Sequence, residues 1–93
     1  MKIYRKYFRT SDGLSDYLFC FEEQRDRTWR AYIQRQPSYR GRATDAHSTH
    51  RLSDGSREYI CWDHPLRTLD EAMRVAAIWA DKTQEYIRSG RRF

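Results

Sequence analysis

The segment from Thr68 to Gly90 constrains the fold of this chain more than any other, because it carries all the signals of one amphipathic helix. Thr68 and Glu71 form a T-x-x-E capping box, in which the threonine hydroxyl accepts from the Glu71 amide and the glutamate reaches back to the Thr68 amide. Gly90 stands where a left-handed residue ends a helix, and no Gly or Pro interrupts the stretch before it. The sequence therefore predicts a closing helix over residues 68–89.

The apolar side chains of this predicted helix recur at helical spacing and form one stripe. The stripe and its flanks are Leu69, Ala72, Met73, Ala76, Trp79, Ala80, Thr83, Tyr86 and Ile87. Its alanines would let another element approach the helix closely. Ile78 and Val75 fall outside the stripe, toward the charged face. They are either isolated surface aliphatics or candidate contacts with a second subunit.

Length and composition predict a single domain over residues 1–93, large enough to bury one core. No apolar run approaches the roughly 20 residues of a membrane span, so a membrane partner is not expected. The N-terminal residues are basic but lack the apolar region of a signal peptide. Cys20 and Cys61 lie in apolar strand contexts. We therefore expect free thiols and a cytoplasmic location.

Five stretches before the helix are predicted as strands. Three are rich in large apolar side chains and run from Lys2 to Thr10, from Asp16 to Glu22 and from Thr28 to Arg35. The third alternates most clearly, with Trp29, Ala31 and Ile33 on one face. After the irregular segment 36–46, His47 to Leu52 is predicted as a short strand, followed by a turn and by a strand from Arg57 to Trp62.

These elements together predict an α+β fold of the order β-β-β-(β-β)-α. We expect a small antiparallel sheet of three to five strands within residues 2–62, with the long C-terminal helix packed on one face. The opposite face of the sheet would then stay open. This open face is the predicted contact surface.

Positive charge is concentrated in the middle of the chain. Net charge is +5, and residues 25–42 hold six arginines against Asp26 alone. Arginine holds phosphate oxygens in two-pronged contacts, and tyrosine offers a ring on which unpaired bases stack. The candidate residues for binding the backbone of DNA or RNA, or another partner, are Arg25, Arg27, Arg30, Tyr32, Arg35, Tyr39, Arg40 and Arg42. The alternative is a solvated basic face that keeps the sheet soluble.

A second hypothesis is a protein-interaction module, most simply a homodimer. Exposed tyrosine and arginine are typical of interface hot spots. Tyr4 or Tyr7, together with Tyr32, would remain on the open sheet face, and Ile78 would remain on the outer side of the helix. The same sheet residues therefore serve both hypotheses.

The sequence gives weaker support for a metal site or a catalytic site than for a binding surface. His47 and His50, like Cys61 and His64, are separated by two residues, and zinc accepts such ligands. Strands, however, place residues three apart on opposite faces. Either cysteine, with His64 and Asp63, has the residue types of a thiolate pair, but apolar surroundings disfavour a thiolate. No cofactor fingerprint is present, so we expect a binding module without catalytic activity.

Overall fold

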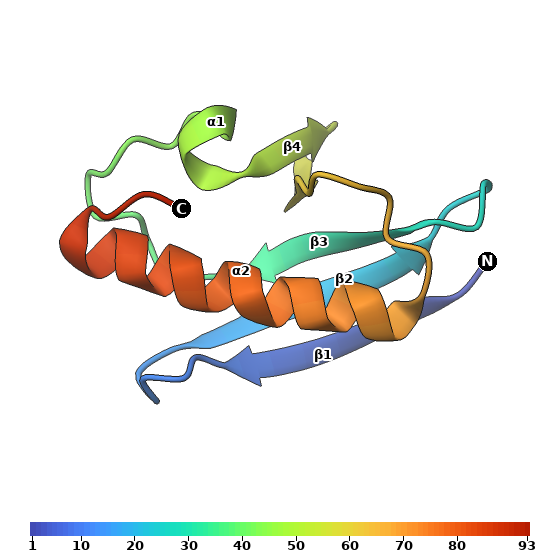
Figure 1. The fold of residues 1–93 in the computed structure, drawn as a ribbon, viewed down its shortest axis with the longest axis horizontal. Helices are drawn as coiled ribbons and strands as arrows, with labels where there is room; N and C mark the ends of the chain where they lie inside the picture. The colour runs from blue at the N-terminus through green and yellow to red at the C-terminus, as the bar shows by residue number, and fades with distance from the viewer.

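The computed structural model describes all 93 residues and has a five-stranded antiparallel sheet with one long helix across it (Figure 1). The strands are β1 (Ile3–Arg9), β2 (Asp16–Glu23), β3 (Trp29–Arg35), β4 (Arg51–Asp54) and β5 (Arg57–Ile60). The helices are α1 (Ala46–Thr49) and α2 (Leu69–Ser89). The predicted α+β fold and its closing helix are confirmed.

The strand order is β1-β2-β3-β5-β4, so the second hairpin joins the sheet through its later strand. β1 and β4 are the two edges. β3 and β5 register at a single pair, Tyr32 with Tyr59, and diverge beyond it. α2 packs mainly over β2 and β3, which leaves β1 at the margin of the helix (Figure 1). These two features, the divergence and the uncovered edge, create the surfaces described below.

The core lies between α2 and the facing side of the sheet. β2 contributes Tyr17, Phe19 and Phe21, and Trp79 of α2 meets the first two rings edge-on, with centroids 6.0 Å apart in both cases. Ala72, Ala76 and Ala80 are almost fully buried, so the predicted alanine-lined approach of the helix to the sheet is confirmed. Aromatic rings from the sheet fill the space that the alanines leave.

The ends of α2 follow the predicted signals, with one difference. The Thr68 hydroxyl accepts from the Glu71 amide at 3.1 Å, and Gly90 ends the helix in a left-handed conformation with φ 79°. The Glu71 carboxylate accepts from the amide of Arg67 at 2.8 Å, one residue before the expected Thr68 amide. The capping contact therefore extends one residue upstream of the helix.

Two expectations were wrong, one about the segment 47–49 and one about the side chain of Val75. Residues 47–49, predicted as the start of a strand, belong to α1, because the Asp45 side chain accepts from the Ser48 amide and caps a short helical turn. His50 then takes a left-handed conformation with φ 53°, and the strand starts only at Arg51. Val75, expected toward the charged face, is buried in the core cluster. The core is therefore wider than the predicted stripe.

Candidate functional site

The sheet face opposite α2, called the outer face from here on, carries no helix. The strand register assigns to it alternate residues of every strand: Ile3, Arg5, Tyr7, Arg9, Asp16, Leu18, Cys20, Glu22, Arg30, Tyr32, Arg35, Leu52, Asp54, Arg57 and Tyr59. Five of these side chains are arginines and three are acids, so the face is basic overall but holds internal ion pairs. The predicted open face is present, and its chemistry depends on how those pairs are arranged.

Tyr32 occupies the centre of this face and is only 3% exposed. The Arg57 guanidinium lies over its ring, 3.6 Å from the centroid, and also pairs with Glu22. The Tyr32 hydroxyl donates to Asp54 at 2.9 Å and accepts from Arg30 at 3.1 Å. Tyr32 was expected to be an exposed stacking platform. Arg57 covers it instead, because β5 lies beside β3 in the sheet.

Hydrogen bonding and burial within this network shift the pKa values of three of its side chains. The hydrogen bond from Arg57 holds the pKa of Glu22 below its usual value. Burial raises the pKa of Tyr32 and also that of the Cys20 thiol, which donates to Glu22 at 3.4 Å. A raised thiol pKa keeps Cys20 protonated, so this cysteine is a packed side chain and not an activated nucleophile.

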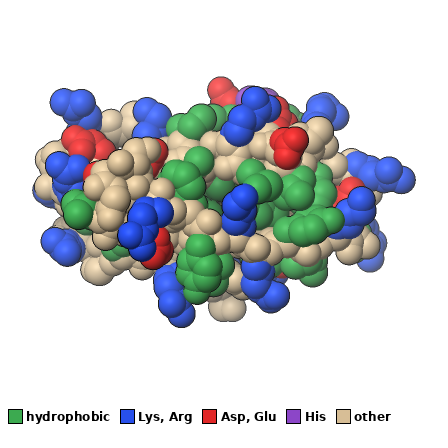
Figure 2. Space-filling view, turned by 90° about the horizontal axis from the view of Figure 1, so that it is seen from below, with side chains coloured by type: hydrophobic (Ala, Val, Ile, Leu, Met, Phe, Trp, Pro, Cys, Tyr) green, Lys and Arg blue, Asp and Glu red, His purple; other side chains and the backbone are tan.

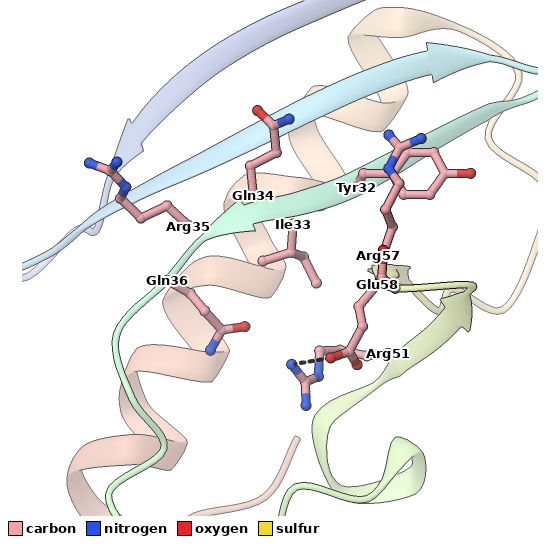
Figure 3. A pocket seen from close by; sticks show the side chains of 9 residues that line it. Tyr32, Ile33, Gln34, Arg35, Gln36, Arg51, Arg57 and Glu58 are labelled. Carbon is pink, nitrogen blue, oxygen red and sulfur yellow. Dashed lines mark ion pairs between the residues drawn. The ribbon is translucent and has the colours of Figure 1, made fainter.

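A cleft of about 540 Å³ opens where β3 and β5 diverge beyond Tyr32 (Figure 3). Its lining consists of Tyr32, Ile33, Gln34, Arg35, Gln36, Arg51, Ser56, Arg57 and Glu58. Three of these nine residues are arginines and one is an acid. Figure 3 shows Arg51 and Glu58 joined on one side of the cleft, with Gln36 beside them and Arg35 pointing away at the rim.

Neighbouring groups hold two of the three cleft arginines in place. Arg51 lies 4.9 Å from the centroid of the Tyr39 ring, pairs with Glu58 at 3.2 Å and donates to the hydroxyl of Thr49. Arg57 is fixed by Tyr32 and Glu22. Arg35 is exposed and forms no ion pair in the structure. The cleft thus combines two positioned cations with one free cation.

The eight predicted contact residues do not converge on one surface. Arg25 and Arg27 lie in the exposed turn before β3, whereas Arg35 and Arg40 lie at and beyond its far end. Arg30, Tyr32 and Arg35 belong to the outer face. Arg30 is held by Asp54 at 3.2 Å.

The other two predicted residues have structural roles. Tyr39 is buried against Tyr86, with ring centroids 6.1 Å apart, and burial raises its pKa. Arg42 donates to the last carbonyls of α2, those of Ile87 at 3.4 Å and Arg88 at 3.3 Å. The side chains of Tyr39 and Arg42 therefore secure the 36–45 segment to α2.

Sequence reasoning missed Arg51, Arg57 and Glu58, because they became cleft residues only through the nonlocal pairing of β5 with β3. The signal that could have found Arg57 is the alternation within 57–60. There Arg57 and Tyr59 share a face, as Arg30 and Tyr32 do in β3.

The histidines and cysteines are dispersed. The His50 ring stacks on Phe93 with centroids 4.4 Å apart, and His64 lies 2.8 Å from Asp63 and 3.5 Å from Glu71. Both cysteines are free thiols. No group of three or more His, Cys, Asp or Glu residues lies where it could hold a metal ion.

Neither helix combines the length and the apolar character that crossing a bilayer requires. Comparison of the chain with protein-family models, with curated proteins and with solved structures finds no match.

Proposed function

We propose that the protein is a small non-catalytic binding module that contacts the phosphate backbone of a nucleic acid with the arginines around the β3–β5 cleft. One observation carries the proposal: Arg35, Arg51 and Arg57 line one cleft whose lining holds a single acid, Glu58. Arg51 and Arg57 are paired with Glu58 and Glu22, so Arg35 at the rim supplies the unpaired charge. Guanidinium groups bind phosphate oxygens through paired N–H donors. The net charge of +5 adds a long-range attraction for a polyanion.

The way the arginines are held also favours this function. Stacking on Tyr39 and Tyr32 fixes the Arg51 and Arg57 guanidiniums, so less side-chain entropy is lost when a phosphate binds. Arg35 has no acid beside it and supplies an uncompensated charge at the rim. Phosphate contacts orient a nucleic acid without reading its bases, so we expect little sequence preference.

The first test is the salt dependence of binding. We expect the protein to bind a fluorescein-labelled, mixed-sequence oligonucleotide at low salt, with an affinity that falls steeply as salt rises. Arg35→Ala should reduce the slope of log affinity against log salt by about 0.7 for a single strand, or about 0.9 for a duplex, as expected for one lost phosphate contact. Fluorescence anisotropy measures this slope.

Arg67→Ala is the matched control, because Arg67 is also exposed and unpaired but lies beside the start of α2. Its slope should equal that of the wild type. Arg30→Ala should change the slope less than Arg35→Ala, since Asp54 already neutralises Arg30. An anisotropy that does not change with DNA or RNA at low salt would end the proposal.

A second candidate, a protein-interaction module, is supported by exposed apolar side chains on two other surfaces, the outer face along β1 and the solvent side of α2. Large apolar side chains are exposed along β1 and on α2, among them Ile3 at 57%, Tyr7 at 56% and Ile78 at 44%. A stable dimer in light scattering that Ile78→Glu dissociates would support the homodimeric form of this function. A monomer at high concentration would exclude that form and leave a partner of different sequence.

A further inference from the structure

β1 is an edge strand whose outer backbone groups have no partner. The amide of Thr10 donates to Ser15, and the amide of Glu23 donates to the carbonyl of Lys2, both at 2.9 Å. Because hydrogen-bonding direction alternates along an antiparallel strand, the even-numbered residues of β1 face β2. The N–H and C=O groups of Ile3, Arg5, Tyr7 and Arg9 therefore point away from the sheet, and no strand pairs with them.

An apolar groove runs beside this edge, between β1 and α2. It has a volume of about 210 Å³, and its residues are Lys6, Tyr7, Phe8, Phe19, Phe21, Met73, Arg74, Ala76 and Ala77. Phe19 and Phe21 are core residues, and the small side chains of Ala76 and Ala77 leave room above them. Figure 2, which views the molecule from the β1 side, shows hydrophobic side chains gathered along the surface with Lys and Arg among them.

The charged side chains of β1 itself are all basic. Lys2, Arg5 and Lys6 on or beside β1 and Arg74 on the groove are all basic, and none of them forms an ion pair. Arg9, the other cation of β1, is held by Asp16 at 2.9 Å. No acid of β1 balances this charge. The exposed edge is therefore an apolar groove and a row of free backbone groups within a basic border.

A second copy of the chain fits this edge poorly. Antiparallel pairing of two β1 strands about their midpoint would place Lys6 opposite Lys6 and align two strands that carry no acid. Like charges directly opposite each other destabilise a strand pair, and lysine on an edge discourages self-pairing. The unpaired basic residues of this edge therefore favour an occupant that brings negative charge.

We infer that the β1 edge and the β1–α2 groove bind an extended acidic segment of another protein, which adds to the sheet as an antiparallel strand. Its backbone pairs with the outward groups of Ile3, Arg5, Tyr7 and Arg9. Its apolar side chains, on the α2 side, enter the groove over Phe19 and Phe21. Its acidic side chains, on the other side, meet Arg5. Strand addition of this kind takes its affinity from the backbone and its specificity from alternate side chains.

A synthetic peptide of alternating glutamate and valine is the probe, and a peptide of the same composition with its glutamates in one block is the control. We expect the alternating peptide to bind and the block peptide to bind about tenfold more weakly, since only alternation separates the apolar side chains from the acidic ones. Equal binding of the two peptides would overturn the inference. Fluorescence anisotropy measures the affinities, with the same fluorescein label on the N-terminus of each peptide.

Amide hydrogen exchange of the intact protein identifies the contact. The outward amides of Ile3, Arg5, Tyr7 and Arg9 should exchange quickly in the free protein and become protected when the alternating peptide is added. Their neighbours in β1 should be protected in both states. Binding without this odd-numbered protection would overturn the inference. The inference would also be overturned if the same amides were protected in the free protein and light scattering showed a dimer, because a second copy of the chain would then occupy the edge.

Tyr7→Pro tests the backbone contact, because it removes an outward N–H that β2 does not use. The Tyr7→Pro variant should bind the peptide about tenfold more weakly than the Tyr7→Ala variant, which keeps the N–H. Arg5→Glu, which leaves the backbone unchanged, should also weaken binding about tenfold through charge reversal. Arg35→Ala should leave peptide binding unchanged, so this site and the nucleic-acid proposal can fail separately.

Discussion

At the residue scale, Tyr32 shows how a strand pattern can be assigned correctly and its exposure still misjudged. The alternation of 29–35 places Tyr32 on the face away from α2, and the register agrees. Yet its ring is covered by Arg57, whose long side chain spans from β5 to pair with Glu22 on β2. No local pattern reveals that cover, because it depends on which strand lies beside β3.

The Glu22–Arg57 pair makes stability depend on pH. The hydrogen bond from Arg57 keeps the pKa of folded Glu22 below its usual value of 4.5, so near that pH the unfolded chain binds more protons. The pair therefore contributes its full stabilisation of the folded protein above about pH 4.5. This stabilisation is lost as the pH falls through the lower pKa that Glu22 has in the folded protein. Glu22→Gln should remove about 1 kcal/mol at neutral pH and reduce the further loss in acid.

Urea unfolding at neutral pH and at about pH 3 measures this difference. Glu23→Gln is the control, since Glu23 is the next residue and forms no ion pair. Its stability should change with pH as that of the wild type does. If Glu22→Gln and the wild type lost equal stability in acid, the ion pair would not account for the depressed pKa.

At the element scale, α2 could be predicted and α1 could not. The signals for α2 are local: a cap, a spacing of three or four residues and a closing glycine. The Asp45 cap is the only local sequence signal for α1. A contact that no local signal announces comes from 30 residues away, where the Trp79 indole donates to the Thr49 carbonyl at 3.0 Å. A nonlocal hydrogen bond of this kind leaves no periodic pattern to read.

Trp79→Phe tests this link between the helices. The change keeps an aromatic ring in the core but leaves the buried Thr49 carbonyl without its donor, so we expect a loss of about 1–3 kcal/mol of unfolding free energy. Trp62→Phe is the control, because Trp62 is only partly buried and its indole donates no hydrogen bond within the structure. Equal losses in the two variants would mean that the Trp79 hydrogen bond contributes nothing measurable.

At the scale of the whole molecule, the layered arrangement could be predicted but the strand order could not. Alternation predicts the faces of β3, and the register agrees. β1 and β2 carry large apolar side chains on both faces, so the sequence leaves open which of their faces meets α2. The insertion of β5 between β3 and β4 has no local signature, and the cleft depends on it. This is why the predicted site contained Tyr32 and Arg35 but lacked Arg51, Arg57 and Glu58.

The basic edge of the sheet has a consequence for assembly. Replacing both Arg5 and Lys6 with valine should promote association through β1, because the charges that oppose edge-to-edge pairing are removed. Sedimentation velocity should show dimers or larger species at concentrations where the wild type remains a monomer. The double variant Arg67→Val/Lys82→Val, with two exposed basic residues outside β1, is the control and should sediment as the wild type does.

β3 and β5 are in register at a single pair, Tyr32 with Tyr59. Side chains therefore join the β4–β5 hairpin to the first three strands where backbone pairing stops: Arg57 pairs with Glu22, and Asp54 pairs with Arg30 and accepts from the Tyr32 hydroxyl. Because dissolved salt screens exposed ion pairs, we expect high salt to weaken the attachment of this hairpin before it disturbs the aromatic interior.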